Sequence, residues 1–212
     1  MRLWVVLVTA VAAGVVAATA QATARPVTSQ DRALLARPAT AEEQVAEQVA
    51  RRLTGHDVSV RCGSIGLSNP NILGVTPLID GHSFDYFLMR PQECTLLTWF
   101  HRTPTRWDPR SCTGEDCSYV PSIAMALAVV SHETYHILGY TNEAQVECYG
   151  MQSIWFVASK LGASVPEAQA LASLYATKMY PLRRTQTPQY WSPECRDGGR
   201  YDLRRSLARW PS

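Results

Sequence analysis

The chain has 212 residues, of which 46% are hydrophobic and 18% are charged, so it has enough apolar side chains to bury one sizeable core. This composition excludes a generally disordered chain. A formal charge of only +2 provides no strong field for a nucleic acid or an anionic membrane surface, and we expect neither as a partner.

Residues 1–24 have the order of a secretory signal peptide. Arg2 is followed by an apolar run over residues 3–18, and small-x-small sequences follow at 18–20 and 22–24. An uncleaved membrane anchor is the alternative, because the run is close to the length that a spanning helix needs. The small residues and the polar sequence after them favour cleavage. We therefore expect a secreted or extracytoplasmic protein without stable membrane association.

Residues 25–40 are rich in Thr, Ser, Pro and Ala and show no sustained periodicity, which predicts a flexible leader. Residues 41–212 show no internal repeat and no second boundary, so we expect them to form a single domain. A short helix opens this domain, with Thr40 as its N-cap, Glu43 as the capping-box partner and Gly55 as the stop.

Short strands and turns are expected after this helix. The stretch "DVSVRC" (57–62) alternates as a strand does, and "FDYFLMRP" (84–91) predicts another strand. Between them, residues 63–83 are dense in Gly, Pro, Asn and Ser, which predicts a loop or a hairpin. Residues 92–101 fit a helix or a strand, because their periodicity does not decide between the two.

The second half of the chain predicts helices throughout. Residues 121–138 begin with Pro at a first-turn position, end at Gly139 and are apolar on nearly every side, which indicates a central, buried helix. The next helix starts at a capping residue, Thr141 or Asn142, and stops at Gly162.

A further helix is expected over residues 166–180 and is broken by Pro181. The tail, residues 182–212, contains several Pro and Gly residues, and Cys195 is the residue that would attach it to the domain. These elements together predict an α+β domain that is mainly helical and has a small β-sheet.

Six cysteines follow the N-terminal segment, and an even number in an exported chain predicts three disulfides whose connectivity the sequence alone does not decide. They are Cys62, Cys94, Cys112, Cys117, Cys148 and Cys195. The stretch "CTGEDC" (112–117) is turn-forming, which favours a local bridge there. Elimination then pairs Cys62 with Cys94 and Cys148 with Cys195. Metal ligation by cysteines is the alternative, and the lack of a C-x-x-C pair disfavours it.

The stretch "SHETYH" (131–136) contains the candidate metal-binding and catalytic residues. His132 and His136 are one helical turn apart on one face of the buried helix, a spacing that one tetrahedral metal ion can bridge. Glu133 is rotated by about 100° around the axis, which places its carboxylate beside a metal-bound water, where a general base belongs. Burying these groups costs free energy unless something satisfies them; a polar stripe that faces solvent is the alternative.

A third ligand is expected from the next helix. Gly139 can adopt a left-handed conformation and turn the chain back on itself. If the next helix then runs antiparallel to the first, Glu143 comes opposite His136 and Glu147 comes opposite His132.

"HETYH" followed by "NEAQVE" resembles the paired motifs of the gluzincin metalloproteases, the thermolysin-like group, over about residues 121–150. The resemblance implies a zincin-like domain that binds Zn²⁺. By motif position, His132, His136 and Glu143 are implied as the zinc ligands, and Glu133 as the general base. Glu147 is implied as the partner that orients His132.

The connection between the two motifs is shorter here than is usual in gluzincins. It is closer to the metzincin pattern, whose glycine Gly139 matches and whose third-ligand position falls on Asn142, a poor zinc ligand. We therefore favour Glu143 over Glu147 as the third ligand and interpret Asn142 as a helix cap.

These residues predict a secreted zinc metallopeptidase that acts on a peptide or protein through a metal-activated water. For the oxyanion donor, Tyr140, Tyr149 and His101 remain unranked, and each is more typical of a packing or surface residue. The strand at residues 84–89 is expected to border the cleft. Two alternatives stay open: a non-catalytic, disulfide-stapled exported binding domain, and a zinc hydrolase that acts on a non-peptide or cell-wall amide. His56 and His82 lie in turn-rich sequence, and we assign them no role.

Overall fold

The computed structural model describes residues 27–63, 72–79, 82–107, 109–110, 118–203 and 209–211. Its helices are α1 (Ser29–Ala36), α2 (Ala41–Thr54), α3 (Pro91–Arg102), α4 (Val120–Ile137), α5 (Glu143–Lys160), α6 (Val165–Leu174) and α7 (Tyr180–Gln186). Its strands are β1 (Ser59–Cys62), β2 (Gly74–Val75), β3 (Leu78–Ile79), β4 (His82–Ser83) and β5 (Tyr86–Met89). The expected mainly helical α+β architecture is confirmed. In the described part of the chain, no helix is both long and apolar enough to cross a membrane.

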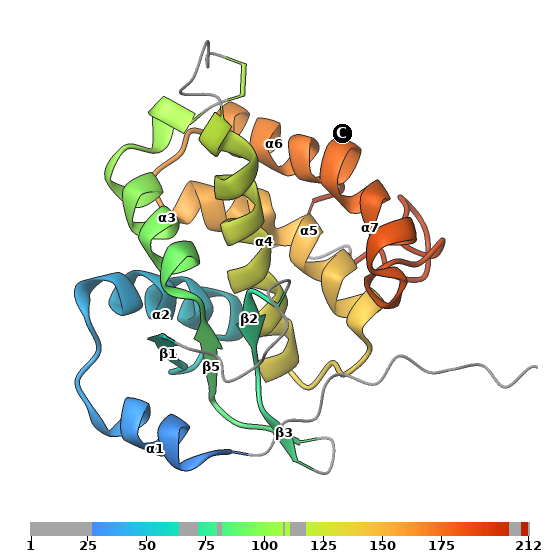
Figure 1. Ribbon diagram of the computed structural model, residues 1–212. Coiled ribbons are helices and arrows are strands. Elements are labelled where there is room, and N and C mark those ends of the chain that lie inside the picture. Colours follow the sequence, from blue (N-terminus) through green and yellow to red (C-terminus); the bar gives the residue numbers. More distant parts are fainter. Residues whose placement is uncertain are drawn as a thin grey trace, which may run out of the picture.

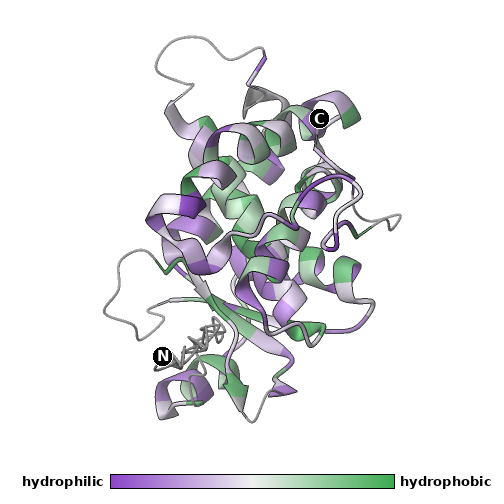
Figure 2. Ribbon diagram, turned by 90° about the vertical axis from the view of Figure 1, so that its right-hand side faces the viewer, coloured by the Kyte–Doolittle hydropathy of each residue, from purple (hydrophilic) through white to green (hydrophobic). Residues whose placement is uncertain are grey.

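Helix α4 is the centre of the molecule. It lies between α3 and α5, and α6 and α7 lie beyond α5 (Figure 1). Helix α2 and the small sheet pack against the C-terminal part of α4. All residues of α4 from Ala126 to Ile137 are buried, as its continuous apolar sequence predicts. The hydrophobic residues follow these central helices in Figure 2. The motif helix is therefore the core of the fold as well as the carrier of the two histidines.

The small sheet lies beside α4 and has the strand order β1-β5-β2. Strand β1 pairs in parallel with β5, and β2 pairs antiparallel to β5 with Gly74 opposite Met89. The predicted strand at residues 84–89 is thus central and fully buried along β5, so the expectation that it borders the cleft is wrong. Strand β2 takes that place at the edge, and β3 and β4 form a separate hairpin within the turn-rich stretch.

The N-terminal segment contains an element that the sequence analysis does not predict. Helix α1 occupies residues 29–36 of the expected leader because Thr28 and Asp31 form a capping box. Its Leu34 and Leu35 pack against a small cluster that includes Val75 of β2. The signal peptide assigned to residues 1–24 lies outside the described residues.

The undecided stretch after β5 is helical. Helix α3 begins with Pro91 in its first turn and buries Cys94, Leu97 and Phe100, which recur at helical spacing. Cys94 forms a disulfide with Cys62 of β1, as elimination predicts.

The second expected disulfide, between Cys148 of α5 and Cys195 of the tail, is also confirmed. The local bridge proposed for residues 112–117 lies outside the described part of the chain. Two disulfides are typical of a protein that folds in an oxidising compartment.

Pro181 does not break the last helix as expected. The chain passes from α6 through a π-helical turn, η3 (Tyr175–Met179), directly into α7, and Pro181 occupies the first turn of α7. The Tyr180 amide donates to the Tyr175 carbonyl in this wider turn, so the helix resumes at a position where the missing amide hydrogen of Pro181 is tolerated. The result is a continuous helical segment that carries Tyr175 and Arg183 toward α5.

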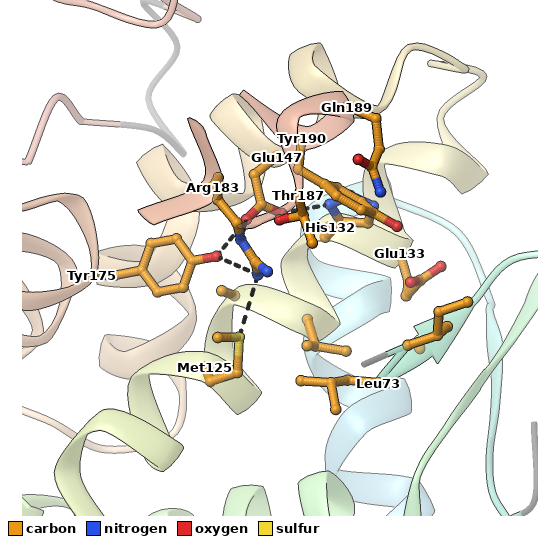
Figure 3. Close-up of a pocket in the computed structure, with 14 residues that line it drawn as sticks. Leu73, Met125, His132, Glu133, Glu147, Tyr175, Arg183, Thr187, Gln189 and Tyr190 are labelled. Atoms are coloured by element: carbon orange, nitrogen blue, oxygen red, sulfur yellow. Dashed lines mark hydrogen bonds and ion pairs between the residues drawn. The ribbon is translucent and has the colours of Figure 1, made fainter. Parts of the chain in front are cut away.

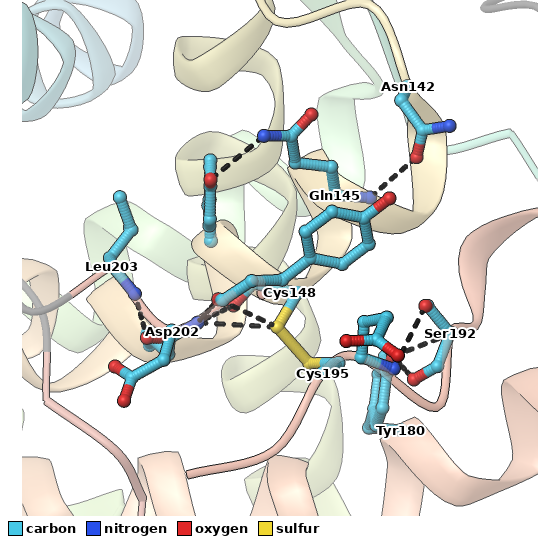
Figure 4. The surroundings of a disulfide bond; sticks show 12 residues. Asn142, Gln145, Cys148, Tyr180, Ser192, Cys195, Asp202 and Leu203 are labelled. Carbon is cyan, nitrogen blue, oxygen red and sulfur yellow. Dashed lines mark hydrogen bonds between the residues drawn. A yellow bond between two sulfur atoms is a disulfide. The ribbon is translucent and has the colours of Figure 1, made fainter. Parts of the chain in front are cut away.

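The tail after α7 is attached to α5 by more than its disulfide (Figure 4). Gln152 of α5 donates from Nε2 to the Tyr201 carbonyl at 2.7 Å, and its Oε1 accepts from the Leu203 amide at 2.9 Å. Tyr180 accepts from the Ser192 amide at 3.1 Å. These bonds and Cys195 hold the short 3-10 helix η4 (Pro188–Tyr190) against the end of α5.

Glu43 joins three parts of the N-terminal half. This fully buried carboxylate accepts from Arg37 Nη1 at 2.7 Å, from the Thr40 amide at 2.8 Å and from the Cys62 amide at 2.7 Å. Burial by itself raises the pKa of Glu43, but the hydrogen bonds from Arg37 and the two amides lower it to about 2. The ionised form of Glu43 is therefore the one that stabilises the fold.

Glu43→Gln tests this contribution. A lowered pKa adds stability above the ordinary value of 4.5, and this stability is lost as the pH falls toward about 2. We expect Glu43→Gln to lower the free energy of unfolding by about 2 kcal/mol at pH 7. The difference from wild type should shrink between pH 4.5 and 2, as measured by chemical denaturation. Glu42→Gln, in the same helical turn, is the control with little change; an equal loss in both variants contradicts this role.

Candidate metal centre

Three buried side chains from α4 and α5 direct one ligand atom each to a common point. His132 Nε2 lies 3.1 Å from His136 Nε2 and 3.1 Å from Glu143 Oε2, and His136 Nε2 lies 3.4 Å from the same Glu143 oxygen. All three residues are at most 7% exposed. Gly139 has a φ of 89°, the left-handed conformation that reverses the chain, and Asn142 caps α5, so the connection is as short as the sequence predicts.

The other ring nitrogen of each histidine has its own acceptor. His136 Nδ1 lies 2.8 Å from the Tyr140 carbonyl, which can only accept, so Nδ1 carries the hydrogen and a neutral His136 presents a lone pair at Nε2. His132 Nδ1 lies 2.9 Å from Glu147 Oε2, which gives neutral His132 the same tautomer. When both histidines are neutral, two imidazole lone pairs and a carboxylate oxygen therefore face one another. Without a bound cation, His132 is protonated and its Nε2 hydrogen is directed to Glu143 Oε2 instead.

This donor set fits a metal ion. A tetrahedral ion with ligand bonds of about 2.0–2.1 Å holds its ligands about 3.3 Å apart, close to the observed triangle of ligand atoms. The group formed by His132, His136 and Glu143 can thus bind a cation without rearrangement. Two nitrogens and one oxygen leave a fourth tetrahedral position free for a water or a substrate.

The charges around this point also favour a cation. Glu133, Glu143 and Glu147 are all buried here, whereas Arg183 is the one guanidinium that contacts any of them among the described residues. Burial lowers the pKa of His132, but hydrogen bonds to Glu143 and Glu147 raise it overall to about 10. Burial raises the pKa of Glu143, whereas its hydrogen bonds to the two histidines hold it well below the usual range. The centre therefore favours positive charge beside the ligand atoms.

Glu147 connects His132 to the C-terminal helices (Figure 3). Its Oε1 accepts from the Tyr175 hydroxyl at 2.5 Å and from Arg183 Nε at 2.9 Å, while Oε2 faces His132. Burial raises the pKa of Glu147, but the charge of Arg183 and the hydrogen bond to His132 lower it to about 2. Sequence reasoning missed Tyr175 and Arg183, because the π-helical turn that brings them to α5 has no signature in the chain.

Strand β2 positions the Glu133 carboxylate. The Thr76 hydroxyl donates to Glu133 Oε2 at 2.8 Å, and a side chain at Gly74 would come within 2.8 Å of the Glu133 carboxylate and 2.9 Å of Val129. Only glycine allows the strand to approach this closely. Burial raises the pKa of Glu133, despite the two nearby histidines. Thr76 and Gly74 were not predicted, and the turn-rich stretch around them gives no signal for this contact.

A cavity of about 260 Å³ opens beside His132 and Glu133. It lies over one face of α4, between β2 and the η4 segment, and Tyr190 of η4 places its ring centroid 5.6 Å from that of His132 (Figure 3). Burial and the surrounding carboxylates raise the pKa of Tyr190, so its hydroxyl stays protonated and can donate a hydrogen bond.

The three residues suggested as oxyanion donors are not at the cavity. The rings of Tyr140 and Tyr149 pack against each other in an aromatic cluster with Tyr135, and His101 is exposed on α3 with Nδ1 3.1 Å from the Leu161 carbonyl. These positions agree with the packing or surface role that is more typical of each of them. Tyr190 is the tyrosine that sequence reasoning missed; the expected attachment of the tail through Cys195 was the one signal pointing to it.

In comparisons with known proteins, no protein-family model, curated protein or solved structure matches the chain.

The ligand geometry predicts metal content directly. We expect wild-type protein to bind about one Zn²⁺ per chain, and His132→Ala and Glu143→Ala to lose it, as measured by elemental mass spectrometry. Glu147→Gln should weaken binding by about 10- to 100-fold, because it changes the partner of His132 and leaves the three ligands themselves in place. His101→Ala and Glu42→Ala are matched controls. Zinc that remains bound in His132→Ala would contradict the site.

Proposed function

We propose that this protein is an exported zinc-dependent metallopeptidase with a zincin-like fold. The observation that carries the proposal is the convergence of His132 Nε2, His136 Nε2 and Glu143 Oε2 on one point, with the Glu133 carboxylate held beside it by Thr76. Two nitrogen ligands, one oxygen ligand and an open position are typical of catalytic rather than structural zinc sites. The substrate class we propose is a peptide or a protein.

Each side chain has a distinct role in this proposal. A zinc ion at the site supplies Lewis acidity, which acidifies a water molecule and polarises the scissile carbonyl. Glu133 is the general base: it accepts a proton from the attacking water and returns it to the leaving amine nitrogen. Burial favours the first of these two transfers, because it raises the pKa of Glu133 and so stabilises the protonated form.

Other residues orient these groups or stabilise developing charge. Glu147 holds the Nδ1 hydrogen of His132 and so keeps the Nε2 lone pair directed to the zinc position. Thr76 keeps Glu133 in place from the side of β2. The Tyr190 hydroxyl is the proposed donor to the oxyanion, since its ring lies over His132 and lines the cavity.

Export is part of the same proposal. Its support is the signal-like order of residues 1–24 together with the two disulfides, which are typical of an oxidising compartment. We propose no nucleic-acid or membrane partner for the mature chain.

Glu133→Gln separates catalysis from binding. The substitution keeps the shape of the side chain but removes the base, so we expect kcat/KM for a quenched-fluorescent peptide to fall by about 10²- to 10⁴-fold while zinc content is unchanged. Glu42→Gln is the matched control on the surface of α2. Undiminished hydrolysis in Glu133→Gln contradicts the proposal, and zinc binding without any amide hydrolysis in wild type favours the binding-domain alternative.

A further inference from the structure

We propose that a groove between α3 and the N-terminal end of α4 binds an uncharged carbohydrate. The two helices that form it pack side by side (Figure 1). Ser122, in the groove, precedes His132 by ten residues, which is about 15 Å along a helix axis. The site is therefore separate from the metal centre, and the inference does not rest on the proposed hydrolytic function.

One continuous helix face forms the α3 side of the groove. Its residues recur at positions i, i+3, i+4 and i+7, the spacing that brings side chains together on one side of a helix. They are Gln92, Thr95, Leu96 and Trp99. The opposite side consists of three residues at the start of α4, which are Ser118, Tyr119 and Ser122. The volume of about 350 Å³ falls within the roughly 300–1,000 Å³ that is usual for small-molecule sites.

Two exposed aromatic rings give the groove its apolar surface. Trp99 is 47% exposed and Tyr119 is 49% exposed, and among the described residues they are the only exposed large hydrophobic side chains that line it. Exposed apolar surface that is gathered in one groove is typical of a binding site. An aromatic ring has a flat apolar face, and one side of a sugar ring is a flat face of C–H bonds, so the two can stack.

Neutral polar side chains surround the two rings. They are Gln92, Thr95, Ser118 and Ser122, and none of these side chains hydrogen-bonds to another described residue. Hydroxyl and amide groups both donate and accept hydrogen bonds. The hydroxyls around a sugar ring do the same, so a ligand with an apolar face and a rim of hydroxyls matches the groove in both respects.

The lining also selects against charge. Among the described residues, no charged side chain lines the groove. A carboxylate, phosphate or ammonium group would lose hydration here without gaining an ion-pair partner. A protein partner fits less well, because a stable protein interface buries about 800 Å² on each side around an apolar centre, whereas polar groups enclose a single aromatic pair here.

Three trisaccharides test the proposed selectivity by titration calorimetry on the full mature chain. The trimer of N-acetylglucosamine and cellotriose are neutral, and the trimer of glucosamine is measured at a pH where its amino groups are charged. We expect both neutral sugars to bind with a Kd of about 1 mM or lower. The charged trimer should bind at least about fivefold more weakly. Zinc-free and zinc-loaded protein should give the same values, because the groove is separate from the metal centre.

Substitutions within the groove locate the binding. Trp99→Ala should raise the Kd at least about tenfold, whereas Trp99→Phe keeps an aromatic face and should raise it about threefold. Ser122→Ala removes one hydroxyl and should raise the Kd about three- to tenfold. This variant keeps the test decisive if Trp99→Ala does not fold. Phe84→Ala, at an exposed ring outside the groove, is the control and should leave the Kd unchanged.

The sugar could belong to a polysaccharide or to a glycoprotein, and two further arms distinguish these sources. Co-sedimentation with insoluble chitin or cellulose tests the polysaccharide, and a glycoprotein measured before and after enzymatic deglycosylation tests the protein-linked glycan. Binding in either arm that is lost in Trp99→Ala supports the inference and identifies the source.

Three results would overturn the inference. They are the absence of binding for both neutral trisaccharides, equal binding of the charged trimer, and sugar binding that neither Trp99→Ala nor Ser122→Ala weakens. Tighter binding of an apolar peptide, lost in Trp99→Ala, would also overturn it and assign the groove to a protein partner. Sugar binding in a protein that hydrolyses no peptide supports the groove and rejects only the proposed peptidase function.

Discussion

The contact between α4 and α5 at His132 is the constraint on which the rest of the structure depends. Gly150 of α5 lies so close that a side chain there would come within 3.1 Å of the His132 backbone nitrogen. This approach puts Glu143 and Glu147 on opposite nitrogens of one imidazole, at 3.1 and 2.9 Å. Because buried carboxylates and imidazoles are costly unless paired, the two helices are stable in this arrangement only when their polar groups satisfy one another or share a cation.

The elements around this contact serve to hold its polar groups in place. The π-helical turn after α6 delivers Tyr175 and Arg183 to Glu147, and the Cys148–Cys195 disulfide holds the tail that carries Tyr190 over His132. On the other side, β2 brings Thr76 to Glu133. The supports on the two sides of the site thus come from the C-terminal segment and from the segment around β2, which lie far apart in the chain.

Local sequence patterns are sufficient to predict the three ligand residues at the centre of the site, but they do not predict the residues that surround them. Helix caps, Gly139 and the i, i+4 histidines depend on neighbours in the chain, so they predicted α4, the short reversal and the approach of α5. Cysteine elimination gave both described disulfides. Thr76, Tyr190 and Arg183 reach the site through tertiary packing, which no local sequence pattern predicts. The π-helical turn also lacks a local sequence pattern, and it allows the helical segment to continue through Pro181.

X-ray absorption spectroscopy at the zinc edge of the purified, zinc-loaded protein is the most direct test of the centre formed by His132, His136 and Glu143. We expect two imidazole nitrogens and oxygen neighbours from Glu143 and a water, all at about 2.0–2.2 Å, and no sulfur. We also expect the imidazole signal to be lost in His132→Ala. Sulfur neighbours at about 2.3 Å, or a spectrum that His132→Ala leaves unchanged, would place the metal elsewhere in the protein and rule out this centre.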